Sequence, residues 1–270
     1  MEQPRLQESV RNIIRAARDE LAALVGEQRV GGEAAWNAPT YCPGWTARDA
    51  VVHLRMVPDA LEDQIRAVAA GTPPPPFDPA RPQVLTARFA TLPREELLAD
   101  LERAYAADFA FFEGLNAEVL ARPLPLPIGP IPLGYASAIR LDELALHRWD
   151  IRAGLDPNAR LRPESVPLLA MILTIAAPSL AQGEKTDGVW QLDVDGPGGG
   201  PVTLRVQGDQ VTATPGRAER PDARLSLDGD AYVRLGWGRL DLAAEIARGR
   251  VRVEGDQARA LALQRLFPGV

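Results

Sequence analysis

A change in hydrophobic periodicity near residue 185 is the feature that most constrains how this chain of 270 residues can fold. Before that point, apolar residues recur every three or four positions, which is the spacing of amphipathic helices. After it, they alternate with polar residues in short runs such as VWQLDVDG and ARLSLDG, which is typical of strands with one buried face. We therefore expect a multidomain protein, with a helical domain followed by a small α+β domain.

Four long helices are predicted in the first part. The first carries an apolar stripe made of Leu6, Val10, Ile13, Ala17, Leu21 and Leu24. The others are expected from Thr46 to about Ala70, from Arg94 to Val119 and from Gly134 to Ala153. Thr46 precedes Asp49 by three positions, which is a helix-capping pattern. Four helices that each have one apolar face indicate a four-helix bundle.

Two proline-rich segments interrupt these helices. TPPPPFDPARP is expected to form a stiff, extended connection. PLPLPIGPIP contains too many prolines for a helix or a central strand, because proline cannot donate a backbone hydrogen bond.

The second part reads as strands with a few short helices. VTLRVQ and QVTATP flank Gly208-Asp209 as a hairpin, and the strand VRVEG comes before a last helix over 256–266. Two short helices are expected around 231–235 and 240–248. We place the bundle at residues 1–160, a helical linker at 161–187 and the α+β domain at 188–270.

Composition excludes several classes of protein. The formal net charge is −6 and the basic residues form no run, which argues against a nucleic-acid partner. The longest charge-free stretch, 166–183, is shorter than the roughly 20 residues of a membrane span and contains Pro167 and Pro178, so we expect a buried helix and no membrane partner. The single cysteine, Cys42, permits no intramolecular disulfide, and no signal-peptide pattern is visible. We expect a cytoplasmic protein.

The chain has two histidines, and both fall on predicted helices of the bundle. Glu143 and His147 are four residues apart on the fourth helix, so their side chains point from one face. His53 lies seven residues into the second helix. Facing helices of a bundle lie roughly 8–10 Å apart, so inward-pointing side chains from both can converge on one ion.

Two imidazoles and one carboxylate form the ligand set of a catalytic zinc site with a fourth position open, and the same set suits non-haem Fe(II). The alternative is an ordinary Glu–His pair on a helix surface. Cys42 is not expected as a fourth ligand, because about 10 Å of helix axis separates it from His53.

Side chains near the two histidines are candidates for supporting roles. Asp150 or Asp49 could orient an imidazole through its second nitrogen, although an acid such as Asp49 is also favoured at a helix start by the helix dipole. Trp45 and Trp149 are expected to pack the bundle. The glycine-rich DGPGGGP should not bind phosphate, because a strand follows it instead of a helix.

The segments CPGWTARDAVVHL and RLDELALHRWDIRAG resemble the mycothiol-dependent maleylpyruvate isomerase family, within the DinB-like metal-binding bundles. The resemblance extends over nearly the whole chain. It implies that His53, Glu143 and His147 bind a metal and that the second domain is a sterol-carrier-type α+β fold, which matches the order of elements expected after residue 186. It also implies a substrate-site arginine, matched here by Arg239 in LGWGRL.

The resemblance further implies a divalent metal, zinc with nickel or iron as alternatives, and mycothiol or an analogous low-molecular-weight thiol as cofactor. The metal would lower the pKa of the thiol, and the thiolate would attack a small electrophilic substrate. Isomerisation and S-transfer are both open, with Arg239 and Asp150 as candidate catalytic residues. Two other hypotheses remain: a metal-dependent hydrolase with a carboxylate such as Asp150 as base, and a non-enzymatic protein that binds a small hydrophobic ligand.

Overall fold

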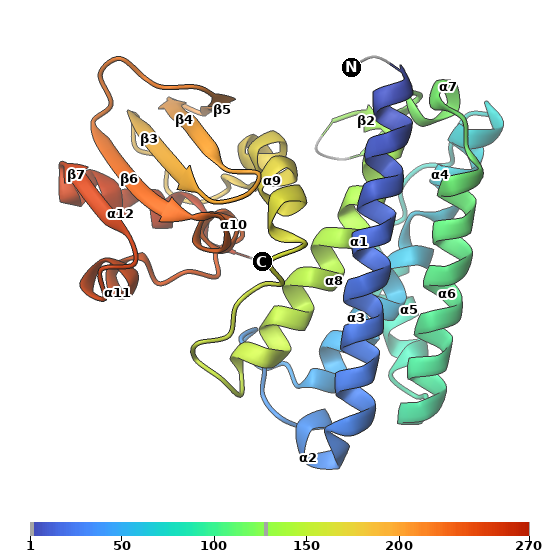
Figure 1. Ribbon diagram of the computed structural model, residues 1–270. Coiled ribbons are helices and arrows are strands. Elements are labelled where there is room, and N and C mark those ends of the chain that lie inside the picture. The colour runs from blue at the N-terminus through green and yellow to red at the C-terminus, as the bar shows by residue number, and fades with distance from the viewer. Residues whose placement is uncertain (1–2, 127–128, 270) are drawn as a thin grey trace. The chain divides into compact units, whose positions relative to one another are not determined.

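The computed structural model describes residues 3–126 and 129–269, and the chain divides into two compact units, Met1–Arg160 and Leu161–Val270 (Figure 1). The division falls at residue 160, before the change in periodicity near residue 185, because the second unit begins with a helical segment.

The first unit is built around four long helices, α1 (Gln3–Val30), α3 (Ala47–Ala60), α6 (Arg94–Gly114) and α8 (Ala136–Ala153). Helix α8 packs against α1 and α3, and α6 contacts the same two helices from the other side. The apolar faces meet in a core that is closed to solvent and includes Ile14, Leu24, Leu54, Leu101 and Leu144. The predicted four-helix bundle is confirmed.

Two of the predicted helices are shorter than expected. The second one divides into α3 and α4 (Glu62–Ala70) at Leu61, where the backbone leaves helical geometry. Pro58 lies in the last turn of α3 and cannot donate a backbone hydrogen bond to the Leu54 carbonyl, which weakens the helix just before this break. The third one ends at Gly114, and the Asn116 side chain then caps the separate short helix α7 (Ala117–Leu120).

The connections hold structure that the sequence pattern did not predict. Helix α2 (Gly32–Trp36) follows α1, and α5 (Arg81–Phe89) starts within the last two residues of the first proline-rich segment. In its described residues the second proline-rich segment forms a two-stranded pair, β1 (Pro123–Leu124) with β2 (Ile131–Pro132). Residues 127–128 of that segment lie outside the described residues. A 3-10 turn, Leu133–Tyr135, leads into α8.

The second unit contains a five-stranded mixed sheet with the strand order β5-β4-β3-β6-β7. Its strands are β3 (Gly188–Asp195), β4 (Gly200–Gln207), β5 (Gln210–Pro215), β6 (Ala223–Asp228) and β7 (Arg252–Gly255). Strands β3 and β6 pair in parallel, and the other neighbours are antiparallel. The β4–β5 hairpin turns at Gly208, whose φ of +56° suits glycine.

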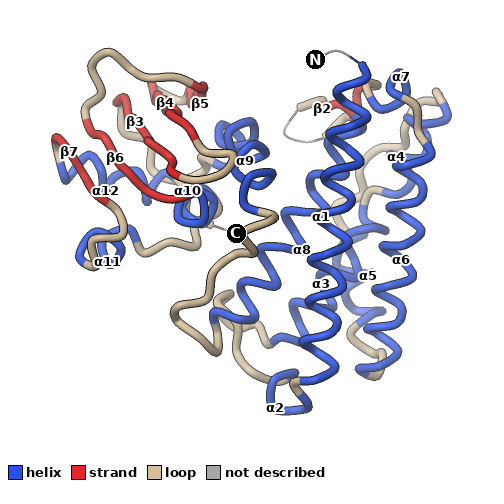
Figure 2. Tube along the Cα trace, in the orientation of Figure 1, coloured by secondary structure: helices blue, strands red, loops and turns tan. Residues whose placement is uncertain are grey.

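Helices complete the second unit (Figure 2): α9 (Val166–Leu180), α10 (Gly229–Gly236), α11 (Leu242–Ala247) and α12 (Gln257–Leu266). Helix α9 packs against α10 and β5, so the segment that we predicted as a linker contributes a helix to this unit. The predicted α+β class is confirmed. In the part of the chain that the structure describes, no helix combines the length and the apolar character that a membrane crossing requires.

Candidate metal centre

Helix α3 begins with a reciprocal cap that fixes where its side chains point. The Asp49 backbone N–H donates to Thr46 Oγ1 at 3.3 Å, and the Thr46 backbone N–H donates to Asp49 Oδ2 at 2.8 Å. Asp49 therefore serves as the capping acid of α3. Asp49 was one of two acids that could orient a histidine, and its role as the cap of α3 explains its presence at the start of that helix.

The three predicted ligands converge from α3 and α8. His53 Nε2 lies 2.9 Å from Glu143 Oε2, and His147 Nε2 lies 3.3 Å from the same oxygen. One donor atom from each of these residues can be chosen so that all lie within 4.8 Å of one another. We call these three residues the His–Glu cluster.

The His–Glu cluster is partly open to solvent. The side chains of His53 and Glu143 are 26% and 28% exposed, whereas that of His147 is 8% exposed. Burial raises the pKa of Glu143, but hydrogen bonds from His147 and His53 outweigh it and hold that pKa well below its usual range. Glu143 is therefore ionised, which is the form that binds a cation.

His147 is contacted at both ring nitrogens. Its Nδ1 lies 2.9 Å from Asp150 Oδ2, and Asp150 is fully buried. Burial lowers the pKa of His147, but contacts with Asp150, Cys42 and Glu143 more than compensate and raise that pKa. A carboxylate on Nδ1 that leaves Nε2 facing the other donors is the usual arrangement of a metal-binding histidine.

This donor set fits a divalent cation. Two imidazole nitrogens and one carboxylate oxygen face one another from two packed helices, with a buried carboxylate behind one imidazole. Such a set matches catalytic zinc sites and also suits Fe(II).

An aromatic ring lies beside both histidines. The Trp45 ring centroid is 5.6 Å from that of His147, nearly stacked, and 5.3 Å from that of His53. The sequence predicted that Trp45 packs the bundle; the half-buried ring also borders the His–Glu cluster. Trp149 does pack: it is 4% exposed, and its Nε1 donates to the Ala159 carbonyl at 2.9 Å.

Cys42 is closer to the site than the sequence suggested. Its Sγ donates a hydrogen bond to Asp150 Oδ2 at 3.3 Å, and it forms a second possible ligand group with His147 and Asp150. The sequence did not predict this contact, because its estimate followed only the axis of α3 from Cys42 towards His53. The loop before α3 instead folds against α8, which carries the other histidine.

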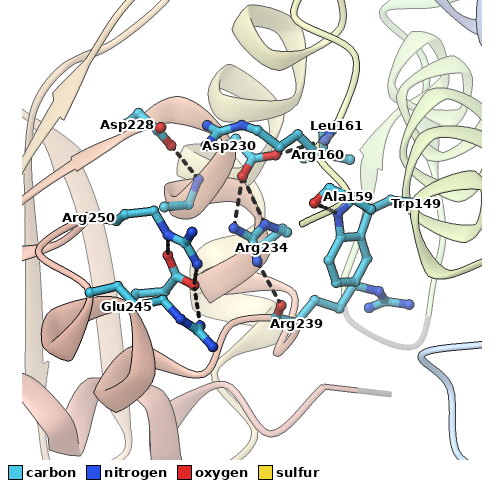
Figure 3. A network of polar contacts seen from close by, with 12 residues as sticks. Trp149, Ala159, Arg160, Leu161, Asp228, Asp230, Arg234, Arg239, Glu245 and Arg250 are labelled. Carbon is cyan, nitrogen blue, oxygen red and sulfur yellow. Dashed lines mark hydrogen bonds and ion pairs between the residues drawn. The ribbon is translucent and has the colours of Figure 1, made fainter. Parts of the chain in front are cut away.

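Arg239 lies in the second unit, just after α10. It is 4% exposed, and its Nη1 donates to the Trp237 carbonyl at 2.9 Å. Figure 3 shows it near a set of ion pairs: Arg234 Nε bonds to Asp230 at 2.9 Å, and Arg250 Nη2 bonds to Glu245 at 2.6 Å. A role for Arg239 at a substrate site stays a prediction.

Comparisons with known proteins agree with the two-unit organisation. Residues 14–152 match the family model "Mycothiol maleylpyruvate isomerase N-terminal domain", and residues 176–268 match that of the "SCP-2 sterol transfer family". No curated protein matches the chain.

Two solved structures share the fold over most of the chain. They are a crystal structure of the mycothiol-dependent maleylpyruvate isomerase, at 17% identity, and one of its histidine-to-alanine mutant, at 16%. Each comparison covers 91% of this chain and 92% of that chain with a TM-score of 0.63. Since the first family model spans about half of the sequence, including both histidines and Glu143, the protein belongs to the mycothiol maleylpyruvate isomerase family.

Proposed function

We propose that this protein is a metal-dependent enzyme that uses an external low-molecular-weight thiol to isomerise a small electrophilic substrate. The observation that carries the proposal is the convergence of His53 Nε2, His147 Nε2 and a Glu143 oxygen from two rigid helices. Family membership adds mycothiol as the thiol and an isomerisation as the reaction. Transfer of the thiol to a substrate is the related alternative.

In this proposal His53, Glu143 and His147 hold a divalent cation, with zinc as the first candidate. When bound, such a cation would supply a Lewis acid that lowers the pKa of a thiol at neutral pH. Three protein donors leave space for one more ligand. The Asp150 carboxylate, with Oδ2 at 2.9 Å from His147 Nδ1, would favour a proton at Nδ1 and leave Nε2 as the metal-binding nitrogen. Trp45 shields one side of the two imidazoles from water.

The isomerisation needs no reactant other than the thiol and the substrate. The thiolate sulfur adds to one carbon of an activated double bond, and the resulting single bond rotates. Loss of the same sulfur restores the double bond in the other geometry and regenerates the thiol. If the sulfur is retained and the carbanion is protonated, the outcome is S-transfer.

Metal content measured by elemental analysis tests the proposal, with Glu143→Gln as the variant. We expect about one zinc, nickel or iron per wild-type chain and less than about a tenth of that in the variant, because the site loses a charged ligand. Glu113→Gln is the matched control: Glu113 pairs with Arg18 at 2.7 Å on the bundle surface. Its metal content should equal that of wild type. Metal-free wild type after purification with added zinc would refute the proposal.

Thiol dependence is the second arm of the test. Wild type should convert maleylpyruvate, the substrate in the name of the structurally similar enzyme, only when mycothiol or a substitute thiol is present. Turnover of amides or thiol conjugates without added thiol would instead support the metal-dependent hydrolase.

A cavity in the second unit favours a second candidate function, the binding of an apolar molecule. Its volume is about 710 Å³, within the range of small-molecule sites. Helix α9, β4, β5 and the glycine-rich turn before β4 line it, mostly with apolar side chains such as Met171, Ile175 and Val202. The match to the sterol transfer family supports the same idea.

Titration with a fluorescent fatty acid tests this second function. Ile175→Asp, at the half-exposed rim of the cavity, should weaken binding at least 10-fold, whereas Val84→Asp on exposed α5 should not. Glu143→Gln should bind the probe as wild type does. Equal binding by Ile175→Asp would exclude the cavity as the binding site.

A further inference from the structure

The loop that precedes α3 has a defined shape around Cys42. The Thr40 N–H donates to the Trp45 carbonyl at 2.9 Å, and the Trp45 N–H donates to the Cys42 carbonyl at 3.1 Å. Gly44 supplies the positive φ, +79°, that this turn requires. Thr40 Oγ1 also accepts the Cys42 backbone N–H at 3.2 Å. These bonds fix the direction in which the Cys42 side chain leaves the loop.

The same loop is attached to α8. The Tyr41 N–H donates to the Asp150 backbone carbonyl at 2.9 Å, and the Tyr41 and Trp149 rings lie 5.0 Å apart. At Gly154 the Pro39 carbonyl approaches so closely that an added Cβ would lie 2.0 Å from its oxygen. The absence of a side chain at Gly154 therefore permits the contact. Cys42 is held against one particular turn of α8.

Cys42 and His147 meet at one carboxylate oxygen. Cys42 Sγ donates to Asp150 Oδ2 at 3.3 Å, and His147 Nδ1 lies 2.9 Å from that same Oδ2. Asp150 is fully buried, so bulk water does not orient its carboxylate, and these two contacts contribute to its orientation. A second bond to Oδ2 restricts rotation of the carboxylate and keeps this oxygen in front of the imidazole.

We propose that Cys42 is a positioning residue, whose thiol holds the Asp150 carboxylate and thereby the His147 ring in the orientation that binds a metal. Its effect reaches the metal only through Asp150 and His147. The inference rests on the proposed function, because it takes the His–Glu cluster as a metal site. It assigns a use to the single cysteine that is distinct from that of a ligand or a nucleophile.

The test compares Cys42→Ala and Cys42→Ser in the full-length protein. Serine keeps a hydrogen-bond donor at this position and alanine removes it. We expect Cys42→Ala to weaken zinc affinity by roughly 3- to 10-fold, at or below the lower end of what loss of a partner behind a metal ligand causes. The visible spectrum of the Co²⁺-substituted protein should change in Cys42→Ala, because the ligand field reports the orientation of His147. Cys42→Ser should have a zinc affinity within about 2-fold of wild type and a Co²⁺ spectrum like that of wild type.

A double variant identifies the route of the effect. If Cys42 acts through Asp150, adding Cys42→Ala to Asp150→Asn should change zinc affinity no further. Cys42→Val, which fills more of the space, replaces Cys42→Ala if the alanine variant does not fold.

The outcomes separate this inference from the proposed function. Wild type that binds neither zinc nor Co²⁺ refutes both. Wild type that binds metal beside a Cys42→Ala variant with equal affinity and an unchanged Co²⁺ spectrum refutes only the role of Cys42. Equal weakening in the serine and alanine variants also overturns it, since hydrogen-bond donation would then not be the cause.

Discussion

Carboxylates at two sites of the molecule, one in each unit, have different partners. In the second unit, Asp230 and Glu245 are 4% and 5% exposed, and each is paired with arginine: Asp230 with Arg234, and Glu245 with Arg250 (Figure 3). In the first unit, Glu143 is contacted by two histidines.

This difference separates a structural charge pair from a site that can exchange its partners. Arginine stays charged at any pH that the protein meets, and its planar donors match a carboxylate, so Asp230–Arg234 is a permanent contact. Histidine can lose its proton near neutral pH and then offers a nitrogen lone pair. A cation can replace the proton between Glu143 and the two imidazoles, but it cannot replace arginine.

The first prediction concerns stabilisation of the folded protein by zinc. Zinc at about 1,000 times its dissociation constant should raise the free energy of unfolding of wild type by about 4 kcal/mol, because it binds only the folded state. Glu143→Gln should show no such gain, and its unfolding in urea should be the same with zinc or with EDTA. Equal stabilisation of wild type and Glu143→Gln would show that zinc acts elsewhere.

The second prediction concerns the permanent pair. Asp230→Ala should lower the free energy of unfolding by about 3 kcal/mol, because it leaves the Arg234 charge, 12% exposed, without this partner. It also removes the acceptor of the Leu161 backbone N–H. Zinc affinity should stay as in wild type.

Glu184→Ala is the control for Asp230→Ala in urea unfolding. Glu184 pairs with Arg265 at 2.9 Å, but both side chains are more than half exposed, so the loss should stay below about 1 kcal/mol. Similar losses in both variants would mean that burial does not distinguish the two pairs.

The third prediction compares the acids beside the two histidines. Asp150→Asn should weaken zinc affinity by roughly 10- to 100-fold, because the His147 ring loses its charged partner. Asp49→Asn should leave zinc affinity within about 2-fold, since Asp49 bonds to Thr46 as the cap of α3. Competition with a zinc chelator measures both values. Equal weakening would indicate that the start of α3, and not Asp150, positions the ligands.

Much of this arrangement could be predicted from local pattern. A period near 3.6 determines which face of a helix is buried, so it also placed Glu143 and His147 on one face. Period two gave the strands of the second unit in the same way. The place of His53 on another predicted helix of the bundle made it the third candidate ligand, and the resemblance to a family implied the same residue.

Pattern could not supply what depends on how loops pack. The proximity of Cys42 to Asp150 results from a loop that folds onto α8, and no periodicity reports such a contact. Helix α5 begins in the last residues of a proline-rich stretch that was predicted to be extended. The break at Leu61 follows the turn that Pro58 weakens, and the sequence shows this proline but not the residue at which the helix ends.

The smallest effect is predicted for the cavity of the second unit. Thr174 Oγ1 donates its single proton to the Ala170 carbonyl at 2.9 Å, so the Tyr232 hydroxyl, 2.9 Å away, is the donor between the two. Tyr232→Phe removes that donor and leaves Thr174 bonded to Ala170. The free energy of unfolding should therefore fall by only about 0.5–1 kcal/mol.

The same variant should bind a fluorescent fatty acid at least as tightly as wild type, since one hydroxyl less makes the wall beside Tyr232 more apolar. Thr174→Val is the complementary change. It leaves the Tyr232 hydroxyl, which is largely buried, without its acceptor, so it should destabilise the protein more than Tyr232→Phe does. If Tyr232→Phe were the more damaging of the two, the direction of this hydrogen bond would be the reverse. The hydroxyl pair would then belong to the polar framework of the second unit, as the Asp230–Arg234 pair does, and not to the wall of a binding cavity.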